Sequence, residues 1–313
     1  MKGMAASRVT SGRRSRRERF FFIYYFYMKG VIIAAGYGTR FLPVTKTVPK
    51  EMLPIIDRPA IDFIVSEFIQ SGIKEILILT SRRKKALDDY FDRETELEEV
   101  FRREGNVTKL AKIAPPDAQI FFRRQTEMKG TGHALLQIKS FTGSEPFVVA
   151  YPDDLHMGTT PLASQLIKKY QETGCCVMSA LHNPPHLERY GILKLDADLS
   201  HVVDIVEKPA PGTEPSQEAS IGRYLFTPDI FPFLEEGWKE HCSSGCTGEY
   251  FHVYALKKLM DQKKVVCAVI EGQRLDTGTP AGYLSAVLRY AYQDPEYRKV
   301  ILEEIENLKR ENR

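Results

Sequence analysis

The sequence predicts an α/β protein with a mixed, mainly parallel central sheet flanked by helices. From Lys29 onward, short apolar runs alternate with segments of helical periodicity, which is typical of strands joined by crossover helices. The first run, GVIIAA, is rich in β-branched residues and is followed by a glycine, which indicates a strand buried on both faces. The chain has 313 residues, 43% of them hydrophobic, which is enough for a core of ordinary size.

The alternation of strands and helices continues to residue 181. Strands are expected at residues 30–35, 75–80, 118–125, 146–154 and 175–181, and helices at 60–72, 131–140 and 161–174. The first of these helices ends at a glycine and places five apolar residues on one stripe: Ile61, Ile64, Val65, Phe68 and Ile69. Residues 82–105 are expected to form two surface helices, and their runs of charge are interpreted as solvated faces.

The alternation of strands and helices ends near residue 185. Three strand-like segments follow one another without intervening helices, at residues 190–196, 201–209 and 220–228. This order predicts a mixed or antiparallel part of the sheet, because antiparallel strands need only short connections. Two helices, at 280–293 and 295–312, are expected to close the chain.

The first 27 residues differ from the rest in composition. They hold seven Lys and Arg against a single Glu, followed by the aromatic run FFFIYYFY. This run imitates a short signal peptide, but no small-residue cleavage site follows, so we interpret Met28 as the true start. Residues 1–27 are then an upstream extension, either non-native or disordered, with a targeting segment or a nucleic-acid-binding arm as alternatives.

Charge and hydropathy exclude other classes of protein for the remainder. Residues 28–313 hold slightly more Asp and Glu than Lys and Arg, which gives no electrostatic footprint for general nucleic-acid binding. No apolar run approaches the roughly 20 residues that a membrane span requires. We therefore expect neither a nucleic acid nor a membrane as a partner.

The five cysteines are too few and too irregularly spaced for a disulfide framework. Cys242 and Cys246 have His241 and His252 nearby, but their spacing fits no usual zinc pattern. We expect reduced thiols in a cytoplasmic protein.

The segment GYGTRFLPVTKTVPKEM, residues 36–52, predicts a phosphate-binding loop. A glycine loop directly after a buried strand lets backbone N–H groups approach a phosphate closely. The dinucleotide pattern G-x-G-x-x-G fails at Phe41, and no G-x-x-x-x-G-K-[ST] occurs in the chain. Three cations, Arg40, Lys46 and Lys50, are instead spaced to reach back over a triphosphate.

Carboxylates follow another strand of the predicted sheet. Asp153 and Asp154 come directly after PFVVAY, at the carboxyl end where open α/β sheets bind ligands. In VEKP, Glu207 and Lys208 occupy adjacent positions of a predicted strand and should point to opposite faces. A buried Glu207 would need hydrogen-bond partners, for which sugar hydroxyls are suitable. His133, at the glycine-led start of a helix, is interpreted as structural.

Six ordered motifs carry a resemblance to a known family. After AAGYGTRFLPVTKTVPKEMLPIIDRPAI come RRQTEMKGTGHAL, AYPDDL, RYGIL, VEKP, IGRYLF and LDTGTPAGY. Together they closely resemble the sugar-phosphate nucleotidyltransferases, and most closely the bacterial UTP–glucose-1-phosphate uridylyltransferases, over essentially all of residues 28–313. The resemblance implies the Rossmann-like nucleotide-diphospho-sugar transferase fold.

The resemblance also implies a role for individual residues. Ala34, Ala35 and Gly36 would hold the base and ribose, and Gly38, Thr39 and Arg40 would face the triphosphate. Gln125 would hydrogen-bond to the uracil, for which Gly130 leaves room, and Lys50 would bridge the phosphates of both substrates. Asp153 and Asp276 resemble the carboxylates that hold Mg²⁺. Gly191, Glu207 and Gly222 match positions that contact the sugar, and Lys208 matches the lysine on its phosphate.

The implied reaction converts UTP and α-D-glucose 1-phosphate to UDP-glucose and pyrophosphate. It would be carried by a single domain at 28–313, with a nucleotide-binding part at 28–155, a sugar-binding part at 156–291 and a C-terminal helix at 295–311. The family implies a homodimer or homotetramer. Two segments depart from the uridylyltransferase pattern. GEYFHVYAL stands where the family has a GEIQLTDA-like segment. DTGTPAGY resembles the corresponding sequence of sugar nucleotidyltransferases in general more than that of the uridylyltransferases.

Three alternatives stay open at the level of sequence. The first is a thymidylyltransferase or another sugar-1-phosphate nucleotidyltransferase, and the second is a catalytically silent paralogue that binds sugar nucleotides. The third is a nucleic-acid-binding protein that uses the Arg-rich arm. The intact charged residues Arg40, Lys50, Asp153 and Asp276 argue against a silent paralogue, because loss of activity normally begins at such groups.

Overall fold

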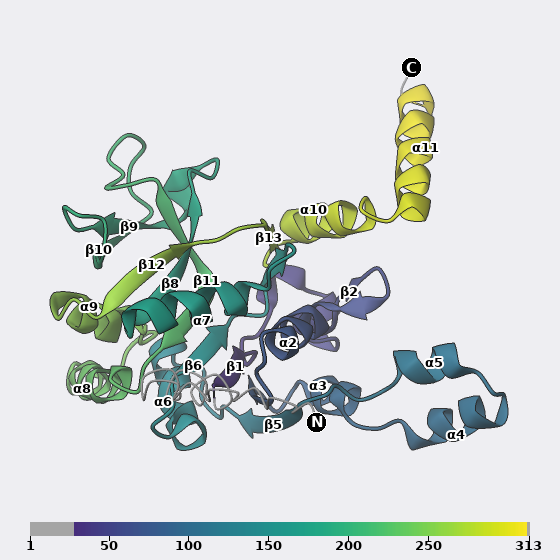
Figure 1. The fold of residues 1–313 in the computed structure, drawn as a ribbon, viewed down its shortest axis with the longest axis horizontal. Coiled ribbons are helices and arrows are strands. Elements are labelled where there is room, and N and C mark those ends of the chain that lie inside the picture. The colour runs from purple at the N-terminus through teal and green to yellow at the C-terminus, as the bar shows by residue number, and fades with distance from the viewer. Residues whose placement is uncertain (1–27, 312–313) are drawn as a thin grey trace, which may run out of the picture.

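The computed structural model describes residues 28–311, so the extension expected at residues 1–27 lies outside the described part. A nine-stranded mixed sheet forms the centre, with seven strands in the order β10-β9-β11-β6-β1-β4-β5; β8 also pairs with β11, and β12 pairs with β8 (Figure 1). Its strands are β1 (Lys29–Ile33), β4 (Glu75–Thr80), β5 (Gln119–Arg124), β6 (Phe147–Ala150), β8 (Cys176–His182), β9 (Gly191–Leu195), β10 (Val202–Glu207), β11 (Glu218–Phe226) and β12 (Val265–Val269).

Strand directions confirm the predicted division of the sheet. β1 pairs in parallel with β4 and β6, and β4 pairs in parallel with β5. β11 runs antiparallel to β6 and β8, and β10 runs antiparallel to β9. Strands β9, β10 and β11 therefore form the antiparallel part, as their short connections predict, whereas the later strand β12 pairs in parallel with β8.

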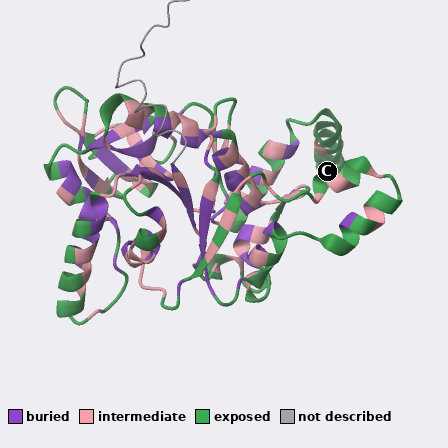
Figure 2. Cartoon of the chain, turned by 60° about the horizontal axis from the view of Figure 1, so that its bottom comes forward, coloured by how far each residue is buried: buried purple, intermediate pink, exposed green. Residues whose placement is uncertain are grey.

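Helices cover both faces of the sheet. One apolar cluster joins α2 (Ala60–Gln70) and α7 (Leu162–Thr173) to one face, and a second joins α6 (Thr131–Thr142), α8 (Ile230–Ser243) and α9 (Val253–Asp261) to the other. Neighbouring residues of β1 divide between them, Ile32 in the first cluster and Val31 in the second, because strand side chains alternate. Figure 2 shows the strands buried between exposed outer helix faces.

Helix α2 illustrates how local pattern becomes packing. Ile61, Ile64 and Phe68 are buried, as the predicted stripe requires. A Cβ at Gly30 of β1 would collide with the Phe68 ring, so the strand approaches the helix closely only because it carries glycine there. After the helix, Gly72 adopts a φ of 83°, a left-handed conformation suited to glycine.

Two short sheets were not separately expected. β7 (Asp154–Met157) pairs antiparallel with β13 (Gln273–Asp276), with Asp154 opposite Asp276, and β2 (Pro54–Ile55) pairs with β3 (Arg58–Pro59). The β7–β13 pair matters for function, because it joins the end of the sheet to a segment more than a hundred residues further along the chain.

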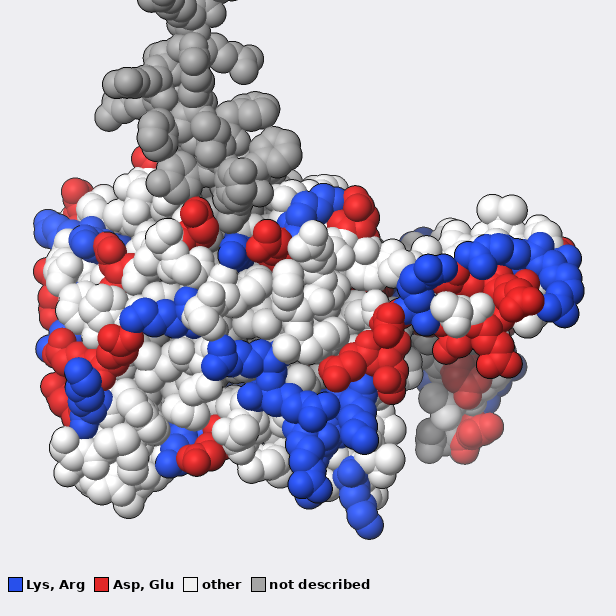
Figure 3. Space-filling view, turned by 90° about the horizontal axis from the view of Figure 1, so that it is seen from below, with Lys and Arg blue, Asp and Glu red and all other residues white. Residues whose placement is uncertain are grey.

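The charged segment 82–105 forms the two predicted helices, α3 (Lys85–Phe91) and α4 (Thr95–Arg103). A third helix, α5 (Val107–Lys112), follows directly after it, and α4 and α5 project from the body (Figure 1). This projection carries intermixed positive and negative side chains (Figure 3). The interpretation of the charge runs as solvated faces is wrong at Lys84 and Glu98, which are buried. Each of these side chains has an oppositely charged partner.

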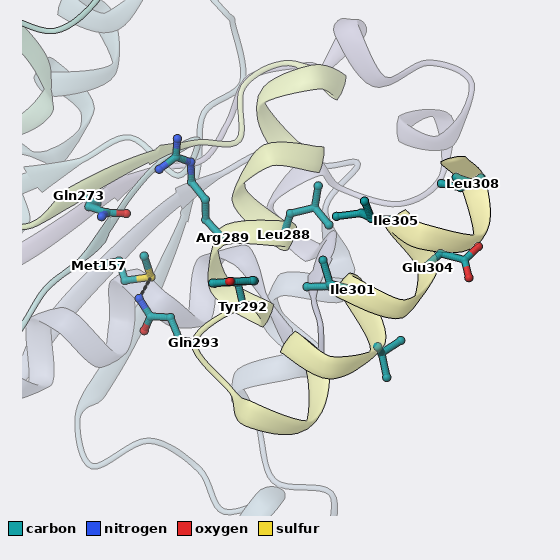
Figure 4. A pocket seen from close by; sticks show the side chains of 11 residues that line it. Met157, Gln273, Leu288, Arg289, Tyr292, Gln293, Ile301, Glu304, Ile305 and Leu308 are labelled. Carbon is teal, nitrogen blue, oxygen red and sulfur yellow. Dashed lines mark hydrogen bonds between the residues drawn. The ribbon is translucent and has the colours of Figure 1, made fainter. Parts of the chain in front are cut away.

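The chain ends in α10 (Pro280–Ala291) and α11 (Pro295–Glu311), which confirms the two predicted C-terminal helices. α11 extends away from the body (Figure 1), and an apolar groove of about 780 Å³ lies between the two helices (Figure 4). Leu288 of α10 and Tyr292, which directly follows that helix, line it together with Ile301 and Ile305 of α11. Among the described residues, no helix is long and apolar enough to cross a membrane.

Candidate active site

A cavity of about 200 Å³ opens at the carboxyl ends of β1, β5 and β6. This is the edge of an open α/β sheet at which ligands bind. Six residues that the sequence singles out line it: Ala35, Gly36, Lys50, Gln125, Gly130 and Asp153. Ala34 lies just behind the wall, and the predicted loop residues Gly38, Thr39 and Arg40 lie outside the lining.

The loop after β1 is held in a defined shape. Gly38 adopts a φ of 69°, and its carbonyl accepts a 2.7 Å hydrogen bond from Thr45 Oγ1. Three short 3-10 helices follow, and the last of them, η3 (Lys50–Met52), begins at Lys50. A Cβ at Gly36 would meet no heavy atom within 4 Å, so the backbone there faces open space that a ligand can enter.

Gln125 and Gly130 form one corner of this cavity. Gln125 is buried, and its Nε2 lies 3.2 Å from Nδ1 of His133. Burial lowers the pKa of His133, so a neutral imidazole can accept this hydrogen bond and orient the Gln125 amide. Gly130 has a φ of 91°, and a Cβ there would lie 2.8 Å from the Tyr250 nitrogen, so the position requires glycine.

Cations and carboxylates converge beside the cavity. Lys50 Nζ donates to Asp153 Oδ2 at 2.7 Å, and Arg40 Nη1 donates to the carbonyl of Gly278 at 3.2 Å. A Cβ at Gly278 would lie 3.1 Å from Asp276 Oδ1, 3.2 Å from Asp153 Oδ2 and 3.5 Å from Arg40 Nη1. The structure thus brings Asp276 next to Asp153, which the sequence alone cannot show.

The two carboxylates form a donor set that fits Mg²⁺. Burial acts to raise the pKa of Asp153, but the Lys50 ammonium outweighs it and holds that pKa below its ordinary value, so the carboxylate is ionised. Hard carboxylate oxygens suit Mg²⁺, which is usually bound by one or two of them together with water and substrate phosphates. Among residues 28–311, no group of three or more His, Cys, Asp or Glu is placed to hold a metal, and Cys242 and Cys246 are free thiols.

A second cavity, of about 360 Å³, adjoins the first, because Thr131 and Tyr151 line both. Gly191, Glu207 and Gly222 line this second cavity. Phe251 and His252 line it too, and both belong to GEYFHVYAL, which departs from the family pattern and is called the departing segment below. A Cβ at Gly191 would lie 2.9 Å from Glu207 Oε1, so glycine is needed for the carboxylate to lie there.

Two expectations about VEKP need correction. Strand β10 ends at Glu207, and Lys208 adopts a φ of 47° outside the strand, so the two residues do not alternate on one strand. The turn forms because the Lys208 nitrogen donates to the carbonyl of Tyr190 at 2.9 Å. Glu207 is exposed at the strand end rather than buried, and Lys208 is exposed and outside the cavity lining.

The sequence placed Asp154 at the ligand-binding edge without assigning it a role, and it gave no signal for Arg274; both residues line the second cavity. Asp154 Oδ2 accepts from the Gly222 nitrogen at 2.6 Å, and its Oδ1 pairs with Arg274 Nε. The pair therefore ties Gly222 to the β7–β13 sheet that carries Asp276. The doubled aspartate of YPDD was the available signal: the carboxylate of Asp153 pairs with Lys50, and that of Asp154 joins Gly222 of β11 to Arg274 of β13.

The departing segment GEYFHVYAL packs against the start of α6. The Tyr250 nitrogen donates to the Lys129 carbonyl at 2.8 Å, and the Gly132 nitrogen donates to the Tyr250 carbonyl at 2.9 Å. His252 is buried, with Nδ1 2.8 Å from Thr131 Oγ1. Burial lowers the pKa of His252 from 6.5 to about 4, so its imidazole is neutral in the folded protein.

The buried His252 predicts a loss of stability in acid. Its folded pKa lies below its unfolded pKa, so the unfolded chain binds the proton first as the pH falls from 6.5 to about 4. Relative to His252→Leu, the wild type should lose about 3 kcal/mol of unfolding free energy over that interval and none above it. Urea unfolding of both proteins across this pH range measures the difference, and a pH-independent difference would contradict a neutral, buried imidazole.

Fold and site together define an α/β enzyme that binds a nucleotide and transfers a phosphoryl-linked group. A glycine backbone, two cations and two carboxylates lie close together at the carboxyl edge of the sheet, where Lys50 and Asp153 line the first cavity. Such an arrangement positions anionic substrates and neutralises the charge between them.

Comparisons with known proteins agree with this class. Residues 29–293 match the family described as nucleotidyl transferase. The chain is 40% identical over 274 residues to a UTP–glucose-1-phosphate uridylyltransferase of Staphylococcus epidermidis, covering 86% of this chain and 93% of that protein. A Bacillus subtilis protein of the same name is 40% identical over 286 residues, covering 90% and 96%. The chain belongs to the nucleotidyl transferase family.

Solved structures extend the similarity to three dimensions. A UTP-bound UGPase from Acinetobacter baumannii superposes with a TM-score of 0.79 at 32% identity, covering 88% of this chain and 99% of that one. A UDP-glucose pyrophosphorylase complexed with UDP-glucose gives a TM-score of 0.71 at 34% identity, covering 85% and 99%. The predicted nucleotide-diphospho-sugar transferase fold is thereby confirmed.

Proposed function

We propose that this protein transfers UMP from UTP to α-D-glucose 1-phosphate and releases pyrophosphate. The observation that carries the proposal is the meeting of Lys50, Asp153 and Asp276 beside two adjoining cavities. One cavity can take the nucleotide and the other the sugar, with the cation cluster at the phosphates between them. The relatives named UTP–glucose-1-phosphate uridylyltransferase, and the neighbours solved with UTP and with UDP-glucose, support these substrates.

The roles implied by the motifs are part of this proposal. On the nucleotide side, base and ribose lie against Ala34, Ala35 and Gly36, the triphosphate lies near Gly38, Thr39 and Arg40, and the uracil is recognised by Gln125 and Gly130. On the sugar side, the hydroxyls meet Gly191, Glu207 and Gly222, and Lys208 pairs with the phosphate. Residues 28–155 then form the nucleotide-binding part and 156–291 the sugar-binding part, and a C-terminal helix follows at 295–311.

Asp153 and Asp276 would hold Mg²⁺ in this proposal. Oxygens of both carboxylates lie close to the position that a Cβ at Gly278 would occupy. This shared position supports the assignment. When bound, the ion would neutralise phosphate charge and help to orient the phosphate oxygens.

The reaction asks for positioning more than for proton transfer. An oxygen of the sugar phosphate attacks the α-phosphorus of UTP in line, and pyrophosphate leaves on the opposite side. This nucleophile is already ionised, so no general base is required. The work left to the chain is to hold two anions together, which Arg40, Lys50 and Lys208 do through charge and hydrogen bonds. We also propose a cytoplasmic homodimer or homotetramer.

Pyrophosphate release tests the proposed function. The full-length protein is assayed with Mg²⁺ and with each of UTP, dTTP, ATP, GTP and CTP against glucose, galactose and N-acetylglucosamine 1-phosphates. Selective turnover of UTP with glucose 1-phosphate is the expected result. Preference for dTTP or for another sugar would replace the substrates while keeping the chemistry, and no turnover with any pair would favour a silent sugar-nucleotide-binding protein.

A further inference from the structure

Lys84 is a buried cation behind the nucleotide-side cavity. It follows β4 on the loop that leads to α3, and its residue is 5% exposed. Its ammonium donates to the Ala34 carbonyl at 2.6 Å and to both Glu51 carboxylate oxygens, at 2.7 and 2.8 Å. The three donors of the ammonium therefore have three acceptors.

Both partners of Lys84 adjoin residues of the cavity wall. Ala34 ends the segment from β1 and precedes Ala35 and Gly36, while Glu51 follows Lys50 in η3. The ammonium thus joins two chain segments that must be correctly spaced for a nucleotide to lie between the glycine loop and the Lys50 cation. No other role assigned above explains this contact.

Stability alone is a weak reason for this ion pair. Desolvation of two charges can exceed their mutual attraction, and buried pairs can often be replaced by apolar groups without loss of stability. Burial lowers the pKa of Lys84 even though Glu51 acts to raise it, which reflects that desolvation. A geometric constraint on the site is a better reason, because small displacements of reacting groups reduce rates strongly.

We propose, building on the function above, that Lys84 is a positioning residue for nucleotidyl transfer. Through Glu51 and the Ala34 carbonyl it fixes the distance between the base-binding end of β1 and Lys50. When the positive charge of Lys84 is removed, the Glu51 carboxylate is free to attract the neighbouring Lys50 ammonium away from the phosphates.

The test compares a single and a double variant of the full-length chain. Lys84→Met leaves the Glu51 carboxylate buried and unpaired, so it is expected to lose both thermal stability and turnover. The double variant Lys84→Met/Glu51→Gln removes both charges at nearly constant shape, and is expected to regain most of the melting temperature. Its kcat should nevertheless stay about 100-fold below that of the wild type, because the two segments are no longer tied.

The control is another ion pair with a buried carboxylate, in which the exposed Arg93, between α3 and α4, donates to Glu98 of α4. Arg93→Met/Glu98→Gln should keep the kcat and KM of the wild type. A Lys84→Met/Glu51→Gln variant with wild-type kcat would overturn the proposal, since the pair would then serve stability alone. Loss of kcat in the Arg93 control would overturn it too, because the effect would not be specific to this position.

UTP binding measured by calorimetry separates this proposal from the proposed function. The Lys84→Met/Glu51→Gln variant should bind Mg-UTP about 10-fold more weakly or worse. Removing a residue that orients a metal ligand without touching the metal typically weakens metal binding by a similar factor. If the wild type binds UTP but turns over no pair of substrates, the proposed function fails while this binding difference still tests Lys84. Unchanged UTP binding by the Lys84→Met/Glu51→Gln variant would refute the positioning role.

Discussion

Replacing Lys50 by alanine is expected to lower kcat for UTP and glucose 1-phosphate by about 10³- to 10⁵-fold, the range found for single cationic groups in phosphoryl transfer. Lys50 Nζ lies 2.7 Å from Asp153 Oδ2, and both residues line the first cavity. A cation there stabilises charge that shifts from the α-phosphoryl group to pyrophosphate during the reaction. KM for either substrate should change much less than kcat. Steady-state assays of pyrophosphate release measure both parameters.

The control for this experiment is Lys109→Ala, which removes an exposed lysine paired with Glu104 near α5. It should leave kcat unchanged. Thermal unfolding of Lys50→Ala checks that the variant is folded, because Asp153 loses its ion pair in it. Turnover by Lys50→Ala within an order of magnitude of the wild type would remove Lys50 from the reaction.

Much of the nucleotide side could be predicted from sequence because its signals are local. A β-branched run followed by glycines indicates a strand and a loop open to a ligand, and β1 and Gly36 are found in those roles. The buried face of α2 could be predicted equally well, because its buried residues follow the 3.6-residue period of a helix. Such features depend on residues that are neighbours in the chain.

The rest of the site depends on contacts between distant segments. Asp276 reaches Asp153 only because β13 pairs with β7, and neither four-residue strand has a pattern long enough to predict. Lys84 lies within the basic run RRKK, where only one side chain turns inward to meet Glu51. Composition could not distinguish that lysine from its exposed neighbours, because the acceptor that selects it comes from another segment.

The contacts of the departing segment GEYFHVYAL could not be predicted from sequence either. The sequence indicated that the family pattern changes there but not what the change contacts. In the structure, the Tyr250 carbonyl accepts a hydrogen bond from the Gly132 nitrogen at the start of α6, while Phe251 and His252 line the second cavity. His252, Val253 and Tyr254 stand at the Leu-Thr-Asp positions of the family pattern, and His252 and Val253 line the second cavity. The change therefore falls on the part of the site where, in the proposed function, sugars would be distinguished.

Arg223→Met is expected to give the largest loss of stability. Arg223 in β11 is 1% exposed and donates to Glu67 of α2, with Nε at 3.2 Å from Oε1 and Nη2 at 2.9 Å from Oε2. Nη2 also donates to the Asp154 carbonyl at 3.3 Å, and Glu67 accepts from the Ala163 nitrogen at the start of α7. The variant leaves the Glu67 carboxylate buried without its cation, which should reduce the unfolding free energy by about 3–5 kcal/mol.

A double variant distinguishes the unpaired charge from lost packing. In Arg223→Met/Glu67→Gln the amide oxygen can still accept from the Ala163 nitrogen, and no ionised group stays buried. We expect urea unfolding to show most of the lost free energy restored, because methionine fills much of the space of the arginine stem. If the double variant were as unstable as the single one, the loss would come from packing around Phe68 and Asp154. If Arg223→Met itself unfolded like the wild type, the buried pair would contribute nothing to joining α2, β11 and α7.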